Sequence, residues 1–406
     1  MRLLLSLLLI GLIALAGSRA MQSRWRVPPV VRRLFDSGLV FLMLGVALGP
    51  AGVGMINDRI LEQTGPIVFF CLGWIGFLFG VHLEWKRLRR LTARMWAATL
   101  SESLLTLVMV LVASWLFFSR WCPTCEGSEA QKWAALLTLA ACAAGTAPAS
   151  VFALNGRPWF RGDIAQAIRV SAALDDLPGL ILFGVMFALL PGDLISAAGV
   201  FSGPAWILLS ILIGVVLGLM MKSLTIMATD TQVQLVVVMG LIAFGAGAAA
   251  FIHLSPIFVG AVAGVTLANT TGRKETVFEL LASSEKTIYV LFLVLVGCHW
   301  APAAEHLLAL TLLYLGVRAA GKVLGGIVGA SLIGVQQPRQ RFGGLAMLGQ
   351  GGLAIAMALN YAWTYEAPIS PTVMTVLIVG VLINELIGPG LAFIPFGPPK
   401  TPGGRR

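Results

Sequence analysis

The sequence is poor in charge. Lys, Arg, Asp and Glu make up only 11% of its 406 residues, against about 25% in a typical soluble domain. Hydrophobic residues make up 58%, and the mean hydropathy is +0.90. A chain with so few charges cannot cover a water-exposed surface, so the composition excludes a soluble globular protein and indicates a polytopic membrane protein.

Several functional motifs are also missing. The sequence contains no nucleotide-binding glycine loop, hydrolase triad or metal-binding cluster, which argues against an enzyme and predicts no cofactor. Cys122 and Cys125 form one CxxC with no second CxxC or histidine pair, so a disulfide is expected if their loop is extracytoplasmic. The net charge of +10 does not predict nucleic-acid binding, because the basic residues sit in short clusters between apolar runs.

Long apolar runs dominate the chain. A membrane-crossing helix needs about 20 such residues, and the sequence predicts about 13 transmembrane helices. They lie near residues 3–19, 35–56, 64–83, 95–118, 133–155, 164–190, 197–221, 232–252, 255–270, 286–301, 304–334, 341–363 and 370–396.

The basic residues predict the orientation. Of the 28 Lys and Arg residues, 21 fall in the loops on one side or in the C-terminus, 4 fall on the other side and 3 lie within segments. The positive-inside rule then places the N-terminus outside and the C-terminus in the cytoplasm. Residues 1–20 also resemble a signal peptide, but the basic stretch from Arg24 to Arg33 favours an uncleaved first helix.

Two adjacent acids, Asp175 and Asp176, lie in the apolar segment 164–190. Each costs roughly 2.5 kcal/mol or more to insert at mid-membrane, so an ion or proton pathway is their default interpretation. Adjacent residues on a helix point about 100° apart, so the two carboxylates are expected to have different roles.

Two segments contain helix-breaking sequences. Gly145-Thr146-Ala147-Pro148 interrupts segment 133–155, and Gln350-Gly351-Gly352 interrupts segment 341–363. Paired interrupted helices in two halves of a transporter indicate a binding site at the membrane midplane. Glycine used only for close helix packing is the alternative interpretation.

Segment 304–334 supplies positive charge through Arg318 and Lys322, which are four residues apart and share a helix face. A buried lysine needs a carboxylate partner or loses its proton, and segments 133–155 and 164–190 offer only Asp175 and Asp176. For Arg318, packing or snorkelling to the interface is an equal alternative.

These residues together resemble the monovalent cation/proton antiporter superfamily, in particular the bacterial sodium/proton and potassium/proton exchanger branch. The likeness covers nearly the whole chain. It rests on Val27-Pro-Pro-Val-Val31, Leu44-Gly-Val-Ala-Leu-Gly-Pro-Ala-Gly-Val-Gly54, Leu72-Gly-Trp-Ile-Gly-Phe-Leu-Phe-Gly-Val-His-Leu-Glu84, Leu174-Asp-Asp176, Leu254-Ser-Pro-Ile-Phe-Val-Gly-Ala-Val-Ala-Gly264, Gly321-Lys-Val-Leu-Gly325 and Gln350-Gly-Gly-Leu-Ala354.

The resemblance implies the sodium/proton antiporter fold: an all-α membrane protein with inverted repeats and two interrupted, crossing helices. It implies a homodimer in the bacterial inner membrane, in which a core moves like an elevator against a scaffold. The scaffold would comprise residues 1–94 and 191–303 and the core residues 95–190 and 304–396, followed by a short cytoplasmic tail, 397–406.

The resemblance also implies site roles. Asp176 would bind the monovalent cation or a proton, Asp175 would pair with Lys322 and release it when the cation binds, and Thr146 would lie near the ion. Exchange of sodium or lithium for two protons would be electrogenic. Potassium/proton exchange is the nearest alternative, and a non-transporting sensor or assembly subunit is the alternative from another class. A channel is disfavoured because the charges are not arranged as rings along a pore.

Three residues complicate this interpretation. Pro178 could re-aim the aspartate pair, and Arg169 could offer it a competing cation. Glu385, in segment 370–396, could be a second ion or pH-sensing group or a paired structural charge. Glu102, in segment 95–118, is expected to be structural.

Overall fold

The computed structural model describes residues 2–22, 34–35, 37–121, 127–152, 154–155, 160–190, 203–227, 230–271, 274–300, 307–365 and 367–396. Within these ranges every regular element is a helix and no strand occurs. The predicted all-α polytopic fold is therefore confirmed. Cys122, Cys125 and the tail 397–406 lie outside the described residues.

The helices follow one another along the chain, and some predicted segments are formed by two of them. The N-terminal half contains α1 (Arg2–Gln22), α3 (Leu39–Leu48), α4 (Asp58–Gln63), α5 (Gly65–His82), α6 (Trp85–Leu88), α7 (Ala93–Trp121), α8 (Glu129–Ala144), α9 (Pro148–Phe152), α10 (Asp163–Leu174) and α11 (Asp176–Leu189). The C-terminal half contains α13 (Gly203–Met227), α14 (Thr231–Phe251), α15 (Pro256–Thr270), α16 (Lys274–His299), α17 (Leu307–Ile333), the 3-10 helix η1 (Pro338–Met347), α18 (Gly352–Thr364), α19 (Ser370–Leu391) and α20 (Phe393–Phe396).

Each predicted membrane segment corresponds to a helix or a pair of helices. Among the described residues, eight helices are long and apolar enough to cross a membrane, or nine if the bent pair η1 and α18 forms one span. Parts of α1, α3 and α15 are shorter apolar helices. Length and composition alone therefore support fewer full spans than the thirteen predicted.

Two predicted boundaries are wrong. In the described part of the segment predicted over 35–56, the long apolar run forms the ten-residue helix α3, because Gly49 ends it in an extended conformation and Pro50 follows. Conversely, α16 begins at Lys274 instead of near residue 286. Lys and Glu are good helix formers, so the polar stretch before the apolar run continues the helix.

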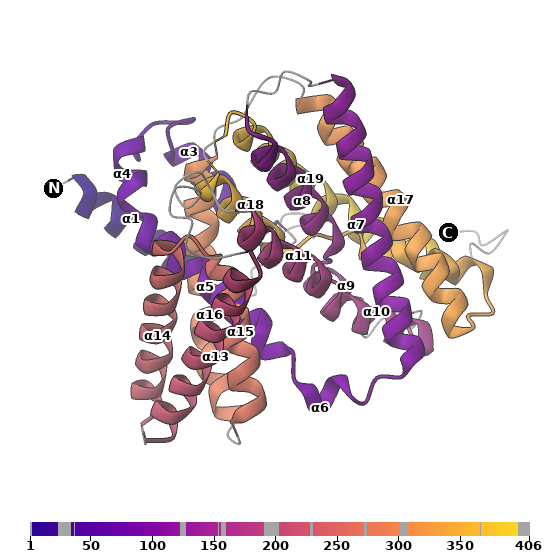
Figure 1. Ribbon diagram of the computed structural model, residues 1–406, viewed down its shortest axis with the longest axis horizontal. Helices are drawn as coiled ribbons and strands as arrows, with labels where there is room; N and C mark the ends of the chain where they lie inside the picture. Colours follow the sequence, from indigo (N-terminus) through magenta and orange to yellow (C-terminus); the bar gives the residue numbers. More distant parts are fainter. Residues whose placement is uncertain are drawn as a thin grey trace, which may run out of the picture.

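The helices form two groups that lie side by side (Figure 1). One group contains α1, α3, α5 and α13 to α16, in which α5 and α13 pack on α15 and α3 packs on α16. The other contains α7 to α11 and α17 to α19, in which α7 packs on α17 and α8 packs on α11 and α18. The first group lies within the ranges predicted as the scaffold and the second almost entirely within those predicted as the core, and the assignment of these roles remains a prediction.

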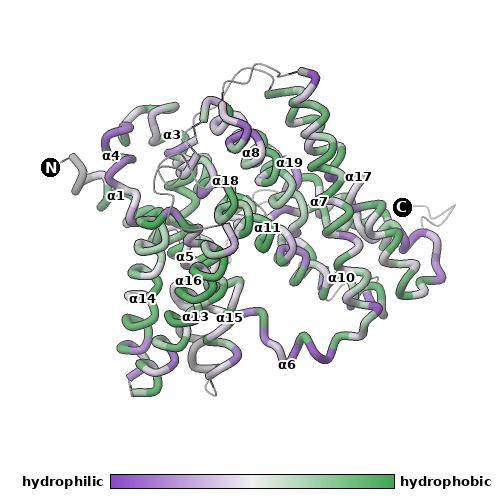
Figure 2. Tube along the Cα trace, in the orientation of Figure 1, coloured by the Kyte–Doolittle hydropathy of each residue, from purple (hydrophilic) through white to green (hydrophobic). Residues whose placement is uncertain are grey.

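The outer faces of the long helices are apolar. Figure 2 shows hydrophobic residues along α13, α14 and α7, and Leu208, Phe244 and Val108 on these helices are 68%, 68% and 50% exposed. Such exposed apolar surface is what helices facing lipid require.

Connections predicted to share a side of the membrane also lie together. Figure 1 shows α6 at the lower edge, together with the C-terminal end of α13 and the N-terminal end of α14. The C-terminal end of α7 lies at the upper edge. That the lower side faces the cytoplasm remains a prediction from the basic residues.

A seam of glycines brings α7 and α17 close together. Gly321 and Gly325, four residues apart on α17, face the backbones of Thr106 and Glu102 on α7. A Cβ atom at Gly325 would collide with the Cα atom of Glu102. Small residues at this spacing let two membrane helices approach at backbone distance.

We expect Gly325→Ala to destabilise the protein by about 1–3 kcal/mol, because the added methyl group overpacks this seam. Gly316→Ala on the same helix is the matched control, since a Cβ there has no neighbour within 4 Å. Melting temperatures of the purified variants test this. Equal melting temperatures for the two variants would contradict it.

Candidate functional site

The first helix break lies between α8 and α9. The helix α8 ends at Ala144, Gly145 is extended with φ −77° and ψ 157°, and α9 begins at Pro148. Proline has no N–H group and disfavours a helical conformation in the residue before it, which explains why the helix stops here. The predicted position of the break agrees with the structure.

The second break lies between η1 and α18, whose axes differ by 45°. Gly351 is extended there, with φ −96° and ψ −177°, and α18 begins at Gly352. The two breaks touch, because the N–H group of Ala147 donates to the carbonyl of Gly349 at 3.0 Å. Gln350 reaches across from the second break, and its Nε2 donates to the carbonyl of Cys142 at 2.7 Å.

The break leaves the carbonyls at the end of α8 without helical partners. Arg318, fully buried, donates to the carbonyls of Ala143 at 3.2 Å and Gly145 at 2.7 Å. It also donates to the carbonyl of Leu348 in the second break, at 2.7 Å. Unsatisfied backbone groups are costly in a membrane, and cations favour a helix C-terminus. Arg318 thus ties both breaks together instead of snorkelling to the interface.

Lys322 lies one turn further along α17 and is also fully buried. Its Nζ donates to the carbonyl of Ala144 at 2.5 Å, to Thr146 Oγ1 at 2.9 Å and to Asp175 Oδ2 at 2.8 Å. The structure thus brings Lys322 and Asp175 together as the sequence predicts.

Asp175 is held firmly. Besides Lys322, its carboxylate accepts from the N–H group of Thr146 at 3.1 Å and from the Thr146 hydroxyl at 2.5 Å. With three donors around it and no exposed surface, this carboxylate is fully compensated.

Glu102 is a partner that the sequence interpretation missed. It lies on α7, and its Oε1 is 2.7 Å from Nζ of Lys322. Glu102 belongs to segment 95–118, outside segments 133–155 and 164–190, in which the sequence predicts the partner of Lys322. The available signal was a glutamate in an apolar helix, four residues before Thr106. The glycine stripe on segment 304–334 predicts that another helix packs closely against it, but it does not identify which helix.

Asp176 is the contrasting carboxylate. It is half-buried, and its Oδ1 lies so close to Gly145 that any Cβ there would collide with it. Within the described residues no N–H or O–H group donates to this carboxylate. Asp176 is therefore a carboxyl group at the first break with no hydrogen-bond donor among the described residues, whereas its neighbour Asp175 has three donors.

Pro178 and Arg169, two residues near the aspartate pair, have different effects on it. Pro178 lacks the N–H that would bond to the carbonyl of Leu174, and the helix divides at Asp175 into α10 and α11. Arg169 donates to Asn155 at 3.4 Å and stacks 5.5 Å from the ring of Phe160. In the described part of the chain it forms no ion pair with Asp176.

One cavity of about 360 Å³ reaches both breaks. Pro148, Gln350, Gly351 and Gly352 line it, together with Glu385 and three residues of α16, namely Glu285, Lys286 and Tyr289. Glu385 accepts from the backbone N–H of Gln350. It therefore both caps the second break and faces the cavity, which leaves its two predicted roles open.

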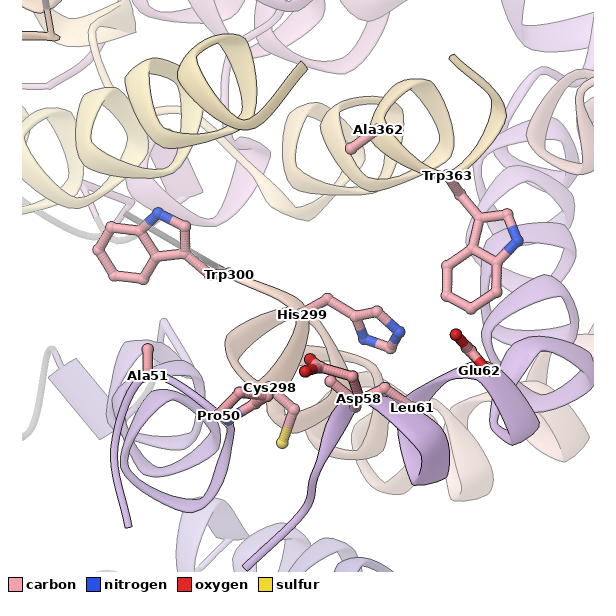
Figure 3. A pocket seen from close by; sticks show the side chains of 10 residues that line it. All are labelled: Pro50, Ala51, Asp58, Leu61, Glu62, Cys298, His299, Trp300, Ala362 and Trp363. Atoms are coloured by element: carbon pink, nitrogen blue, oxygen red, sulfur yellow. The ribbon is translucent and has the colours of Figure 1, made fainter. Parts of the chain in front are cut away.

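A second cavity, of about 460 Å³, lies between the two helix groups. Asp58 and Glu62 of α4 and His299 of α16 point into it, and Trp300 and Trp363 flank it (Figure 3). The first cavity contacts the middle of α16 and the start of α18, and the second contacts the C-terminal ends of both helices. The two cavities are therefore displaced from each other along α16 and α18.

We expect Arg318→Met to lower the melting temperature more than any surface substitution. The substitution leaves three buried carbonyls without a donor, and each unsatisfied carbonyl lowers the free energy of unfolding by about 1–3 kcal/mol. Arg169→Met is the matched control, because Arg169 makes only a 3.4 Å bond to Asn155 and a ring contact. An equal, small effect of both substitutions would show that Arg318 does not hold the breaks.

The comparisons with known proteins agree with this architecture. A search of curated proteins found no match. The family model described as "Sodium/hydrogen exchanger, transmembrane" matches residues 9–396. The match covers both helix breaks, the aspartate pair and the two basic residues of α17. The chain therefore belongs to the transmembrane sodium/hydrogen exchanger family.

Proposed function

We propose that this protein exchanges sodium or lithium ions for protons across the membrane and that Asp176 carries the substrate. One observation supports this assignment most strongly: Asp175 has three donors, whereas no described group donates to Asp176. A half-buried carboxylate without a bonded partner at a helix break is suited to bind a monovalent cation or a proton in turn.

The surroundings of Asp176 fit this exchange. A proton neutralises the carboxylate in one state, and a cation does so in the other. Helix breaks in transporters free backbone carbonyls that can coordinate a cation, but Arg318 and Lys322 already occupy those of Ala143, Ala144 and Gly145. The substrate cation therefore depends mainly on the two aspartates, and when it recruits Asp175 it displaces Lys322 from that carboxylate.

Alternating access would use the two cavities. One lies beside the breaks, and the other lies at the far ends of α16 and α18, between the two helix groups. An elevator-like shift of the core, residues 95–190 and 304–396, against the scaffold would open the site to each side in turn. By the family likeness we propose that two copies of the scaffold form a homodimer.

Two alternatives remain distinct from this proposal. Potassium/proton exchange would use the same residues, since selectivity depends on the size of the site and the placement of its oxygens. A sensor or assembly subunit on the same scaffold would not need an uncompensated Asp176 beside a helix break. The buried charges therefore favour transport.

We expect proteoliposomes containing the wild-type protein and an internal pH dye to change pH when sodium or lithium is added outside. Asp176→Asn should abolish the response, because an amide carries neither the charge nor the exchangeable proton. Arg169→Gln, outside the proposed site, is the control and should retain it. A larger response to potassium than to sodium would select the alternative substrate.

A folded preparation that responds to none of the three cations would refute antiport and favour the sensor. Folding is checked by a cooperative melting transition of the same preparation. A response that survives in Asp176→Asn would instead refute the assignment of Asp176 while leaving antiport intact.

We also expect transport to be electrogenic, with two protons per cation, as the resemblance implies. The initial rate should then change when the membrane potential is clamped with potassium and valinomycin, because each net charge couples to about 2.3 kcal/mol per 100 mV. A rate independent of the clamped potential would indicate one proton per cation.

A further inference from the structure

The position of Glu102 is fixed by the packing of α7 on α17. Its backbone lies against Gly325, where even a methyl group would not fit, and its side chain is 2% exposed. Its Oε1 is 2.7 Å from Nζ of Lys322, as close as that of Asp175 at 2.8 Å. Lys322 therefore stands between two carboxylates from two different helices.

Lys322 has more acceptors than it has protons to donate. Four oxygens lie within 2.9 Å of Nζ: those of Glu102, Ala144, Thr146 and Asp175. An ammonium group has three donor hydrogens. If Asp175 turns away, Lys322 keeps its hydrogen bonds to the Ala144 carbonyl and the Thr146 hydroxyl, and Glu102, 2.7 Å away, remains as its counter-ion.

We propose that Glu102 is a positioning residue that holds Lys322 when the substrate cation takes Asp175. This inference rests on the proposed function, in which the cation and Lys322 compete for Asp175. Glu102 lowers the cost of that competition, because a buried charge left without a partner is strongly unfavourable. The apparent affinity for the cation then depends on Glu102 although Glu102 does not touch the cation.

Glu102→Gln tests this role. Lys322 would then have Asp175 as its only anionic partner, and the cation would have to displace it at greater cost. We expect the KM for the cation to rise roughly tenfold, a typical size for coupling between contacting residues, while the maximal rate stays within about a factor of two. Ser103→Ala, which removes only a hydrogen bond to Thr99 within α7, is the matched control and should leave both unchanged.

A double-mutant cycle separates positioning from a direct charge effect. Cation dissociation constants are obtained from the rise of the melting temperature with sodium concentration, which requires no transport. In a Lys322→Gln background, Glu102→Gln should change the dissociation constant by less than about twofold, because its effect passes through Lys322. An undiminished effect in that background would overturn the proposal.

Glu102→Asp provides a second variant that keeps the charge. Its KM should lie within about threefold of the wild-type value, whereas impairment equal to that of Glu102→Gln would indicate a packing role and also overturn the proposal. A wild-type protein that transports none of the cations would instead refute the proposed function, so the two failures can be told apart.

Discussion

The central constraint is the set of carbonyl groups that the break in α8 leaves inside the membrane. The helix stops at Gly145, and its last carbonyls need donors where no water or lipid group can supply them. Arg318 and Lys322 on α17 and Gln350 at the second break supply them. These donors join α8, α17 and η1, so the geometry of the site and the packing of the core share the same bonds.

The two basic residues then require carboxylates. Both are fully buried, and buried cations without counter-ions are strongly unfavourable. Asp175 and Glu102 meet this need at Lys322, and the glycine seam between α7 and α17 brings Glu102 within reach. Arg318 is compensated differently, by carbonyl dipoles from both breaks. The breaks, the cations and two of the acids therefore form one mutually dependent unit.

The sequence predicted most of this unit, because rare residues in apolar segments are conspicuous. Asp175, Lys322, Gly145 and Pro148 stood out against their surroundings, and the structure places them together. Glu102 was expected to be structural, but it was not identified as a partner of Lys322. Which helix contacts α17 is a property of tertiary packing, and one glycine seam fits several partners. The length of α3 was also missed, because the apolar run continues past the Gly-Pro pair that ends the helix.

Charge balance supports the proposal that this site binds a cation or a proton. With every group ionised, Arg318 and Lys322 contribute two positive charges, and Glu102, Asp175 and Asp176 contribute three negative charges. The cluster then carries one excess negative charge. We assign this charge to Asp176, because among the described residues it is the only one of the three carboxylates with neither a hydrogen-bond donor nor an ion-pair partner. One proton or one monovalent cation restores neutrality there.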